Sequence, residues 1–201
     1  GSLPMYAVKI VQGIIFPVKD MSFNELLFVG RSLSALADAG TVIMVFLLGS
    51  KLYGRSVGIL AALLLAISVL HIQLSHFYTV DTYLTFFIVT SVYFMAQVME
   101  KGKTRDSILA GAFIGLALAS KISVAPLFLA YILVHLIYVS SRSIENPNLF
   151  KRFRHFKSII KRNLLPRIMT VLALFFITTP YAFLDWYRPN PCEVPFSFLR
   201  F

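Results

Sequence analysis

Long apolar runs dominate this sequence and limit what it can fold into. A helix needs about 20 mostly apolar residues to cross a bilayer. Six segments approach that requirement: 29–50, 56–74, 82–99, 107–120, 123–141 and 168–184. Only 14% of the 201 residues are charged, whereas a soluble domain has about 25%. The sequence therefore predicts an all-α polytopic membrane protein of about six transmembrane helices with additional interfacial amphipathic helices.

Positive charges are distributed unevenly over the connections between these segments. Thirteen of the 19 Lys and Arg residues fall on one side, eight of them within 142–167. An excess of basic residues marks the cytoplasmic side, so the turn at 71–81 and the turn at Lys121 are both expected on the outer side. The net charge of +10 follows from this topology, and we do not expect nucleic acid as a partner.

We interpret residues 1–201 as part of one transmembrane domain in the plasma membrane. Its basic loop places apolar residues at helical spacing with Lys and Arg between them, a pattern typical of a helix on anionic lipid. The predicted parts are an outer juxtamembrane segment with an interfacial helix (1–24), five spans (29–141), the basic cytoplasmic amphipathic loop (142–167), a sixth span (168–184) and an outer tail (185–201).

A polar stretch separates the second and third apolar segments and contains His71, His76 and Asp81. Acidic residues in membrane segments are rare and often functional. Asp81 either caps the third helix or faces an outer cavity, where it binds a metal or orients a nucleophilic hydroxyl. The spacing of five residues does not place all three side chains on one helix face. We interpret His71 as structural and leave His76 open between a structural and a binding role.

Several other polar residues interrupt the apolar pattern. Lys121, at the tip of a predicted hairpin, either extends to the interface or binds a phosphate together with the neighbouring serines. Arg31, at the outer end of the first span, is placed to meet a phosphate, and Asp185 is a further candidate at the end of the last span. Asp38 and His135 lie inside apolar segments and are expected to bond to neighbouring helices.

Four motifs in order resemble membrane glycosyltransferases of the protein O-mannosyltransferase and aminoarabinose transferase superfamily (glycosyltransferase family 39-like), which has the C-type (GT-C) fold. Together they extend over nearly all of the chain. They are Arg31-Ser-Leu-Ser-Ala-Leu with Leu52-Tyr53-Gly54, Ser75-His-Phe-Tyr-Thr-Val-Asp81 and the residues to Phe87, Gly115-Leu-Ala-Leu-Ala-Ser-Lys121, and Pro180-Tyr-Ala-Phe-Leu-Asp185.

The resemblance implies an enzyme that moves a sugar from a polyprenyl-phosphate donor to an acceptor hydroxyl on the outer face, with inversion. Asp81 corresponds to the second acidic residue of the site, and Lys121 and Arg31 match the phosphate-binding role. His76 and Asp185 are further candidates for substrate binding. The acceptor is a protein, a lipid or a glycan. The resemblance fixes no cofactor, because relatives differ in metal use, and a divalent cation is left open.

One departure concerns the principal catalytic acid, which the family carries in its first outer loop and which nothing here matches. The sequence is therefore expected to be a fragment of a longer protein and inactive alone. Two alternatives are a transporter or flippase with Asp38, His135 and Asp81 as an ion pathway, and a non-catalytic membrane scaffold. A transporter favours polar groups near mid-membrane, whereas the polar residues here gather at one face, which favours the enzyme.

Overall fold

The computed structural model describes residues 3–15, 23–143 and 165–178 of the chain. Within these ranges the protein is helical and contains no β-strand, as the apolar runs predict. The helices are α1 (Leu3–Ile15), α2 (Phe23–Tyr53), α3 (Arg55–Ala66), α4 (Val69–His76), α5 (Val80–Lys101), α6 (Thr104–Ser120), a single 3₁₀ turn η1 (Ile122–Val124), α7 (Ala125–Ser143) and α9 (Leu165–Thr178).

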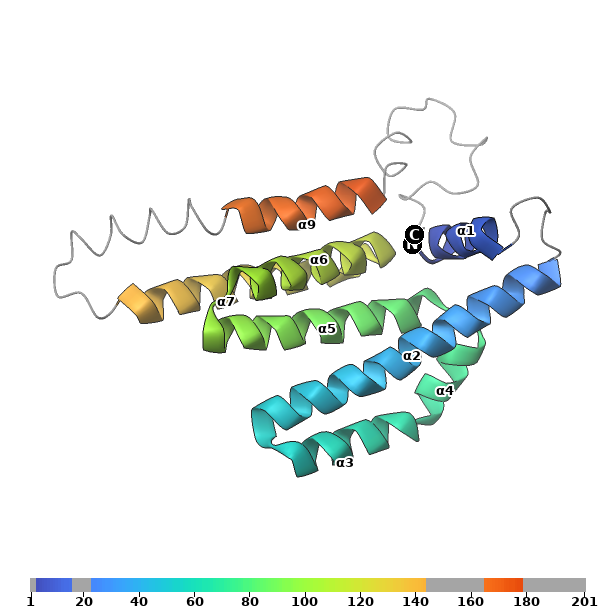
Figure 1. Cartoon of the computed structure of the whole chain (residues 1–201), viewed down its shortest axis with the longest axis horizontal. Helices are drawn as coiled ribbons and strands as arrows, with labels where there is room; N and C mark the ends of the chain where they lie inside the picture. Colours follow the sequence, from blue (N-terminus) through green and yellow to red (C-terminus); the bar gives the residue numbers. More distant parts are fainter. Residues whose placement is uncertain (1–2, 16–22, 144–164, 179–201) are drawn as a thin grey trace.

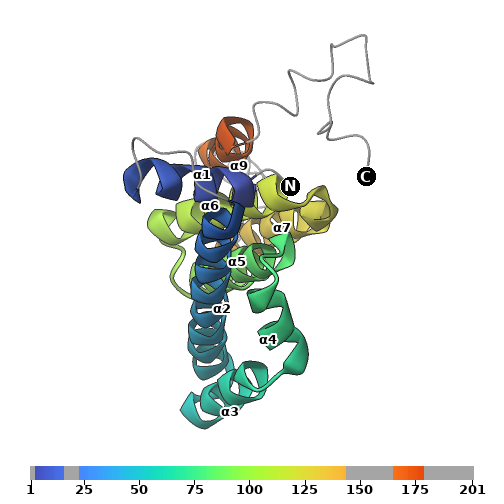
Figure 2. The same cartoon turned by 90° about the vertical axis from the view of Figure 1, so that its right-hand side faces the viewer.

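The helices α5, α6, α7 and α9 form a bundle of neighbouring, roughly aligned helices, and α2 crosses α5 at an angle (Figure 1). The hairpin of α2 and α3 extends to one side, away from α9, as the view along the bundle shows (Figure 2). One apolar cluster, centred on Tyr83, Leu84 and Phe87, joins α5 to α6 and η1. A second cluster, which includes Ile114 and Val171, joins α5, α6, α7 and α9.

The number of membrane crossings differs from the predicted six. Two helices, at 24–53 and 80–101, are long and apolar enough to cross a bilayer. The predicted span 56–74 is not one straight helix, because α3 and α4 meet at a bend of 57°, and it counts as a third crossing only as a broken span. The bend falls where the backbone of Ser68 is extended. The described residues thus support two or three crossings, and six are not confirmed.

Glycines allow the close contact between α2 and α3. Gly54 joins the two helices with φ 99°, a conformation that other residues rarely adopt. Further along the hairpin, a Cβ on Gly49 would lie 3.0 Å from the Cα of Gly58. Small residues at such positions let helix backbones approach each other in a membrane, so α3 packs directly on α2.

The turns predicted to share one side of the membrane lie at one end of the bundle (Figure 1). We call this the Asp81 end; it consists of the N-terminal ends of α2 and α5 and the hairpin between α6 and α7. The helix α1, predicted as the helix of segment 1–24, packs against α2 and α6 there. At the opposite end, here called the basic end, Lys51 pairs with Glu100. The predicted loop between α7 and α9 and the tail with Asp185 lie outside the described residues.

The contact between α6 and α9 gives a stability prediction. A Cβ on Gly115 would lie 2.9 Å from the carbonyl oxygen of Val171 and 3.0 Å from Leu174 Cβ. Gly115→Val is therefore expected to lower the free energy of unfolding by about 1–3 kcal/mol through overpacking, measured by thermal unfolding in detergent. Gly13→Val is the matched control, because a Cβ on Gly13 has no neighbour within 4 Å. Equal effects of the two substitutions would contradict this packing.

Candidate functional site

Asp81 lies in the first turn of α5, at the polar end of an otherwise apolar helix. The N-cap residue is Thr79, so Asp81 occupies the second helical position and does not cap the helix itself. Hydroxyls of Thr79 and Thr82 both donate to the carbonyl oxygen of Leu74, over 3.3 and 3.2 Å. These bonds join the end of α4 to the start of α5. They fix the backbone that carries Asp81, and the helix dipole favours a carboxylate at this position.

Lys121 lies at the tip of the hairpin between α6 and α7, as the sequence predicts. Its extended backbone, with φ −157° and ψ 123°, ends α6, and its N–H donates to the carbonyl oxygen of Ala117. The neighbouring serines are not equivalent: Ser120 is fully buried and donates to Leu116, whereas Ser123 is exposed. Of the two serines in the phosphate-binding alternative, only Ser123 is exposed beside Lys121, whereas the Ser120 hydroxyl is bonded inside its own helix.

The fold brings Asp81 and Lys121 together across 40 positions of sequence. The Lys121 ammonium donates to Asp81 Oδ1 over 3.0 Å, and the two side chains are 52% and 48% exposed. An ion pair this exposed contributes about 0–1 kcal/mol to stability. The fold therefore depends little on this pair, and both groups remain accessible to a ligand that approaches the Asp81 end.

The other predicted binding residues are placed less closely. Arg31 is exposed near the N-terminal end of α2, at the same end of the bundle. His76 is exposed at the end of α4, and its Nδ1 lies 2.8 Å from the carbonyl oxygen of Ile72, so Nδ1 carries the proton. No described interaction joins His76 to Asp81. Asp185 lies outside the described residues.

The described residues contain no group of three His, Cys, Asp or Glu side chains that could hold a metal ion. The histidine and acid inside the apolar segments are used between helices instead. Asp38 Oδ1 on α2 lies 2.5 Å from His71 Nδ1 on α4, which confirms the structural interpretation of both residues.

His135 forms a second interhelical contact, again as predicted. Its Nδ1 donates to the carbonyl oxygen of Tyr131 over 2.8 Å, and its Nε2 accepts a hydrogen bond from the Ser107 hydroxyl over 2.8 Å. Tyr131 OH donates to the carbonyl oxygen of Ser107 over 2.9 Å. The three residues are buried, and their bonds join α6 to α7. These bonds join the two helices of the hairpin whose tip is Lys121.

Tyr78 also belongs to the Asp81 end, although the sequence analysis does not name it as a site residue. It lies in the turn between α4 and α5 with φ 50°, a left-handed conformation that costs a residue with a side chain about 1–2 kcal/mol. Its ring meets Tyr83 edge to face at 6.3 Å between centroids. Burial, and to a smaller extent the nearby Tyr83, raise the pKa of Tyr78 to about 12. The phenol therefore stays neutral at physiological pH.

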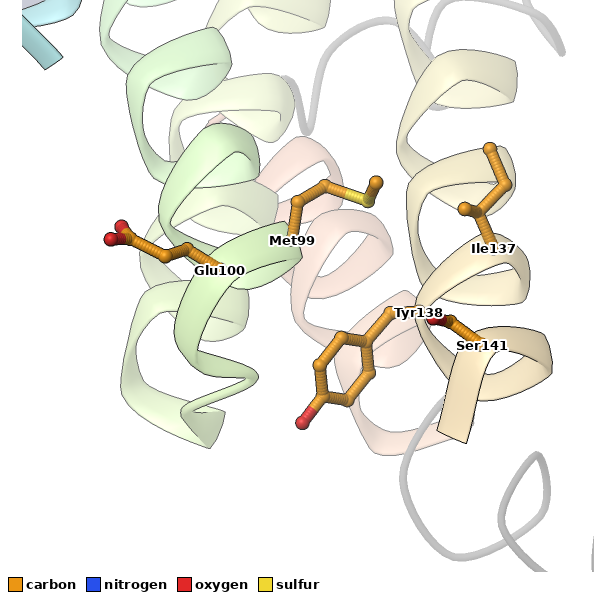
Figure 3. A pocket seen from close by; sticks show the side chains of 5 residues that line it. All are labelled: Met99, Glu100, Ile137, Tyr138 and Ser141. Atoms are coloured by element: carbon orange, nitrogen blue, oxygen red, sulfur yellow. The ribbon is translucent and has the colours of Figure 1, made fainter. Parts of the chain in front are cut away.

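A hollow of about 130 Å³ lies between α5 and α7 at the basic end (Figure 3). None of the predicted site residues belongs to it. Its lining consists of Met99, Glu100, Ile137, Tyr138 and Ser141.

An all-helical membrane protein with an accessible acid–lysine pair at one end of its bundle fits a membrane-embedded transferase. Residues 21–151 match the family of dolichyl-phosphate-mannose-protein mannosyltransferases, and the chain belongs to this family. The match confirms the resemblance to C-type membrane glycosyltransferases. It includes Arg31, His76, Asp81 and Lys121, whereas Asp185 lies beyond it. No curated protein and no solved structure matches the chain.

Proposed function

We propose that this protein, produced from its complete gene, transfers a sugar from a polyprenyl-phosphate donor to an acceptor hydroxyl at the Asp81 end, with inversion at the anomeric carbon. The observation that carries the proposal is the accessible contact of Asp81 with Lys121 inside the family-matched region. Such a site has a carboxylate and a cation at the end of a bundle of membrane helices, where a lipid-linked donor and a polar acceptor can meet.

The two groups have complementary roles in the proposed reaction. The acceptor oxygen forms a bond to the anomeric carbon while the bond from that carbon to the phosphate oxygen breaks, and the phosphate leaves with the electron pair. A base removes the acceptor proton, and cationic groups stabilise the charge on the departing phosphate. Asp81 accepts a hydrogen bond from the acceptor hydroxyl and orients it, while Lys121 and Arg31 engage the phosphate.

The orientation in the membrane follows from the same proposal. Lys51, Arg55, Lys101 and Lys103 lie at or next to the basic end, opposite the Asp81 end. Because basic residues favour the cytoplasmic side, this distribution supports a cytoplasmic basic end and an Asp81 end outside the cytoplasm. The plasma membrane is the location that we propose.

The contacts of the acids and histidines favour a transferase over a transporter. Asp38 pairs with His71, His135 bonds to Ser107 and Tyr131, and Asp81 pairs with Lys121. The acids and histidines suggested for an ion pathway thus have different partners on different helices. A connected series of protonatable groups would be expected of a pathway through the membrane.

The proposal is tested with membranes that contain the protein expressed from its complete gene and a radiolabelled polyprenyl-phosphate mannose donor. We expect label to move from the lipid fraction to a lipid-free acceptor product, and not in membranes without the protein. NMR of the product is expected to show an anomeric configuration opposite to that of the donor. Movement of intact donor across the bilayer without transfer would instead support a flippase. If neither sugar transfer nor movement of the donor is seen with mannose, glucose and aminopentose donors, the transferase proposal is rejected.

A further inference from the structure

We propose that Tyr78 is a positioning residue whose ring, seated on Gly30, sets the distance between Arg31 and the Asp81–Lys121 pair, so that both cations reach the same donor phosphate. The inference rests on the function proposed above. It adds to that function the contact that keeps Arg31 at a fixed distance from the Asp81–Lys121 pair. We call the contact between Tyr78 and Gly30 the Tyr78 clamp.

The contact itself is close and specific. A Cβ on Gly30 would lie 2.8 Å from Cγ of the Tyr78 ring and 2.9 and 3.0 Å from its two Cδ atoms. Only a residue without a side chain allows the ring to lie on α2 at this point. Tyr83 strengthens the same contact, because its hydroxyl reaches the carbonyl oxygen of Gly30 at 3.5 Å and its ring meets that of Tyr78.

The clamp joins the two parts of the proposed site. On one side, Gly30 directly precedes Arg31 in α2, so the position of the ring fixes where the arginine leaves the helix. On the other side, Tyr78 lies three residues before Asp81, whose carboxylate contacts Lys121. The hydroxyls of Thr79 and Thr82, on either side of Asp81, both donate to the carbonyl oxygen of Leu74 and so hold the backbone that carries Asp81. A shift of the ring therefore changes the separation of the two cations.

The backbone of Tyr78 supports a role beyond packing. A left-handed conformation in a bulky residue persists only when surrounding contacts impose it, and such strained residues gather at functional sites. Here the imposed conformation directs the ring toward α2. The turn would reach α5 without strain if a glycine replaced Tyr78, but the ring that rests on Gly30 would then be lost.

A second glycine provides a matched control. A Cβ on Gly40 would lie 2.7 Å from Cε2 of Phe86, so α2 makes a similar glycine–aromatic contact with α5 ten residues further along. That contact carries no polar residue of the proposed site. Gly30→Ala and Gly40→Ala are thus expected to lower the stability of the protein by similar amounts. Only Gly30→Ala is expected to change the proposed site.

The experiment measures donor KM, kcat and thermal stability in purified full-length protein for Gly30→Ala, Gly40→Ala, Tyr78→Phe and Tyr78→Ala. We expect Gly30→Ala and Tyr78→Ala to raise the KM for the polyprenyl-phosphate sugar about ten-fold and to change kcat less. The reason is that both substitutions weaken the contact between Arg31 and the donor phosphate, which is a charge-assisted hydrogen bond. Tyr78→Phe keeps the ring on Gly30 and is expected to raise KM less than Tyr78→Ala does. Gly40→Ala is expected to lower the melting temperature and leave KM unchanged.

The double substitution Gly30→Ala/Tyr78→Ala separates contact from function. Without the ring, the added methyl group has space, so its effect on the melting temperature should largely disappear, while KM stays high. The clamp is rejected if Gly30→Ala and Gly40→Ala change KM equally, or if the effects of Gly30→Ala and Tyr78→Ala on stability are additive. If the wild-type protein transfers no sugar, the proposed function fails, and the stability measurements alone decide whether the contact exists.

Discussion

Asp81→Asn is expected to lower sugar transfer by about 100-fold or more while the protein remains folded. The asparagine keeps the shape of the side chain but removes the negative charge that pairs with Lys121. It also replaces one of the two hydrogen-bond-accepting oxygens with an NH2 group that only donates. Loss of one orienting group typically reduces rates by about this factor. The measurement is the initial rate of transfer from polyprenyl-phosphate sugar in membranes with equal amounts of each variant.

The half-exposed position of Asp81 makes this substitution informative. Because an ion pair this exposed contributes only about 0–1 kcal/mol to stability, a large loss of activity cannot come from unfolding, and thermal unfolding should confirm this. Asp106→Asn is the matched control, since Asp106 also lies in the first turn of a helix but at the opposite end of the bundle. Undiminished transfer by Asp81→Asn, or an equal loss in Asp106→Asn, would remove Asp81 from the proposed site.

Lys121→Met is expected to act on the donor and not on the acceptor. Methionine keeps much of the length of the side chain but cannot stabilise the leaving phosphate, so the donor loses a charged partner, whose hydrogen bonds contribute about 1.5–3 kcal/mol. Loss of this partner should raise the KM for the donor, lower kcat, or do both. The KM for the acceptor should not change.

The sequence predicts the helices and their direction better than it predicts their contacts. Apolar length locates α2 and α5, and the breaks at Gly54 and near Lys121 follow from residues that interrupt the pattern. The bend between α3 and α4 was missed because the apolar run continues through Ile67 without a proline or glycine. Apolar periodicity records only which residues avoid water, so it does not distinguish a straight span from a broken one.

The candidate site was predictable only in part, because the sequence indicates on which side a residue lies but not which residues it contacts. Charge topology places Asp81 and Lys121 on the same side, but their contact depends on how α5 packs against α6, which neither residue encodes. The sequence did not show that the Ser120 hydroxyl is bonded within α6, although a hydroxyl on a helix readily donates to the carbonyl oxygen four residues earlier. The sequence gives no sign of the positioning role proposed for Tyr78, because that role depends on a backbone angle and on a glycine 48 positions away.

Removal of Asp38 is expected to have the largest effect on stability among the polar substitutions considered. Asp38 and His71 have side chains only 19% exposed and lie 2.5 Å apart between α2 and α4. Asp38→Ala leaves the imidazole donor of His71 without its acceptor in apolar surroundings, which costs about 3 kcal/mol. The helix α4 should then pack less firmly on α2, and thermal unfolding in detergent should show a clear decrease in melting temperature.

Replacing both partners tests whether the cost arises from the unpaired group or from the loss of the pair. Replacing both partners of a buried hydrogen-bonded pair by apolar residues of similar size is often neutral or stabilising, so Asp38→Leu/His71→Leu is expected to recover most of the stability lost in Asp38→Ala. The leucines supply packing but no directional bond. If the double variant is as unstable as Asp38→Ala, the specific contact between Asp38 and His71 holds α4 in place. If Asp38→Ala causes no loss, the contact contributes nothing to the fold. Apolar packing then holds α4 on α2, and the bonds of Thr79 and Thr82 to Leu74 hold α4 at the start of α5.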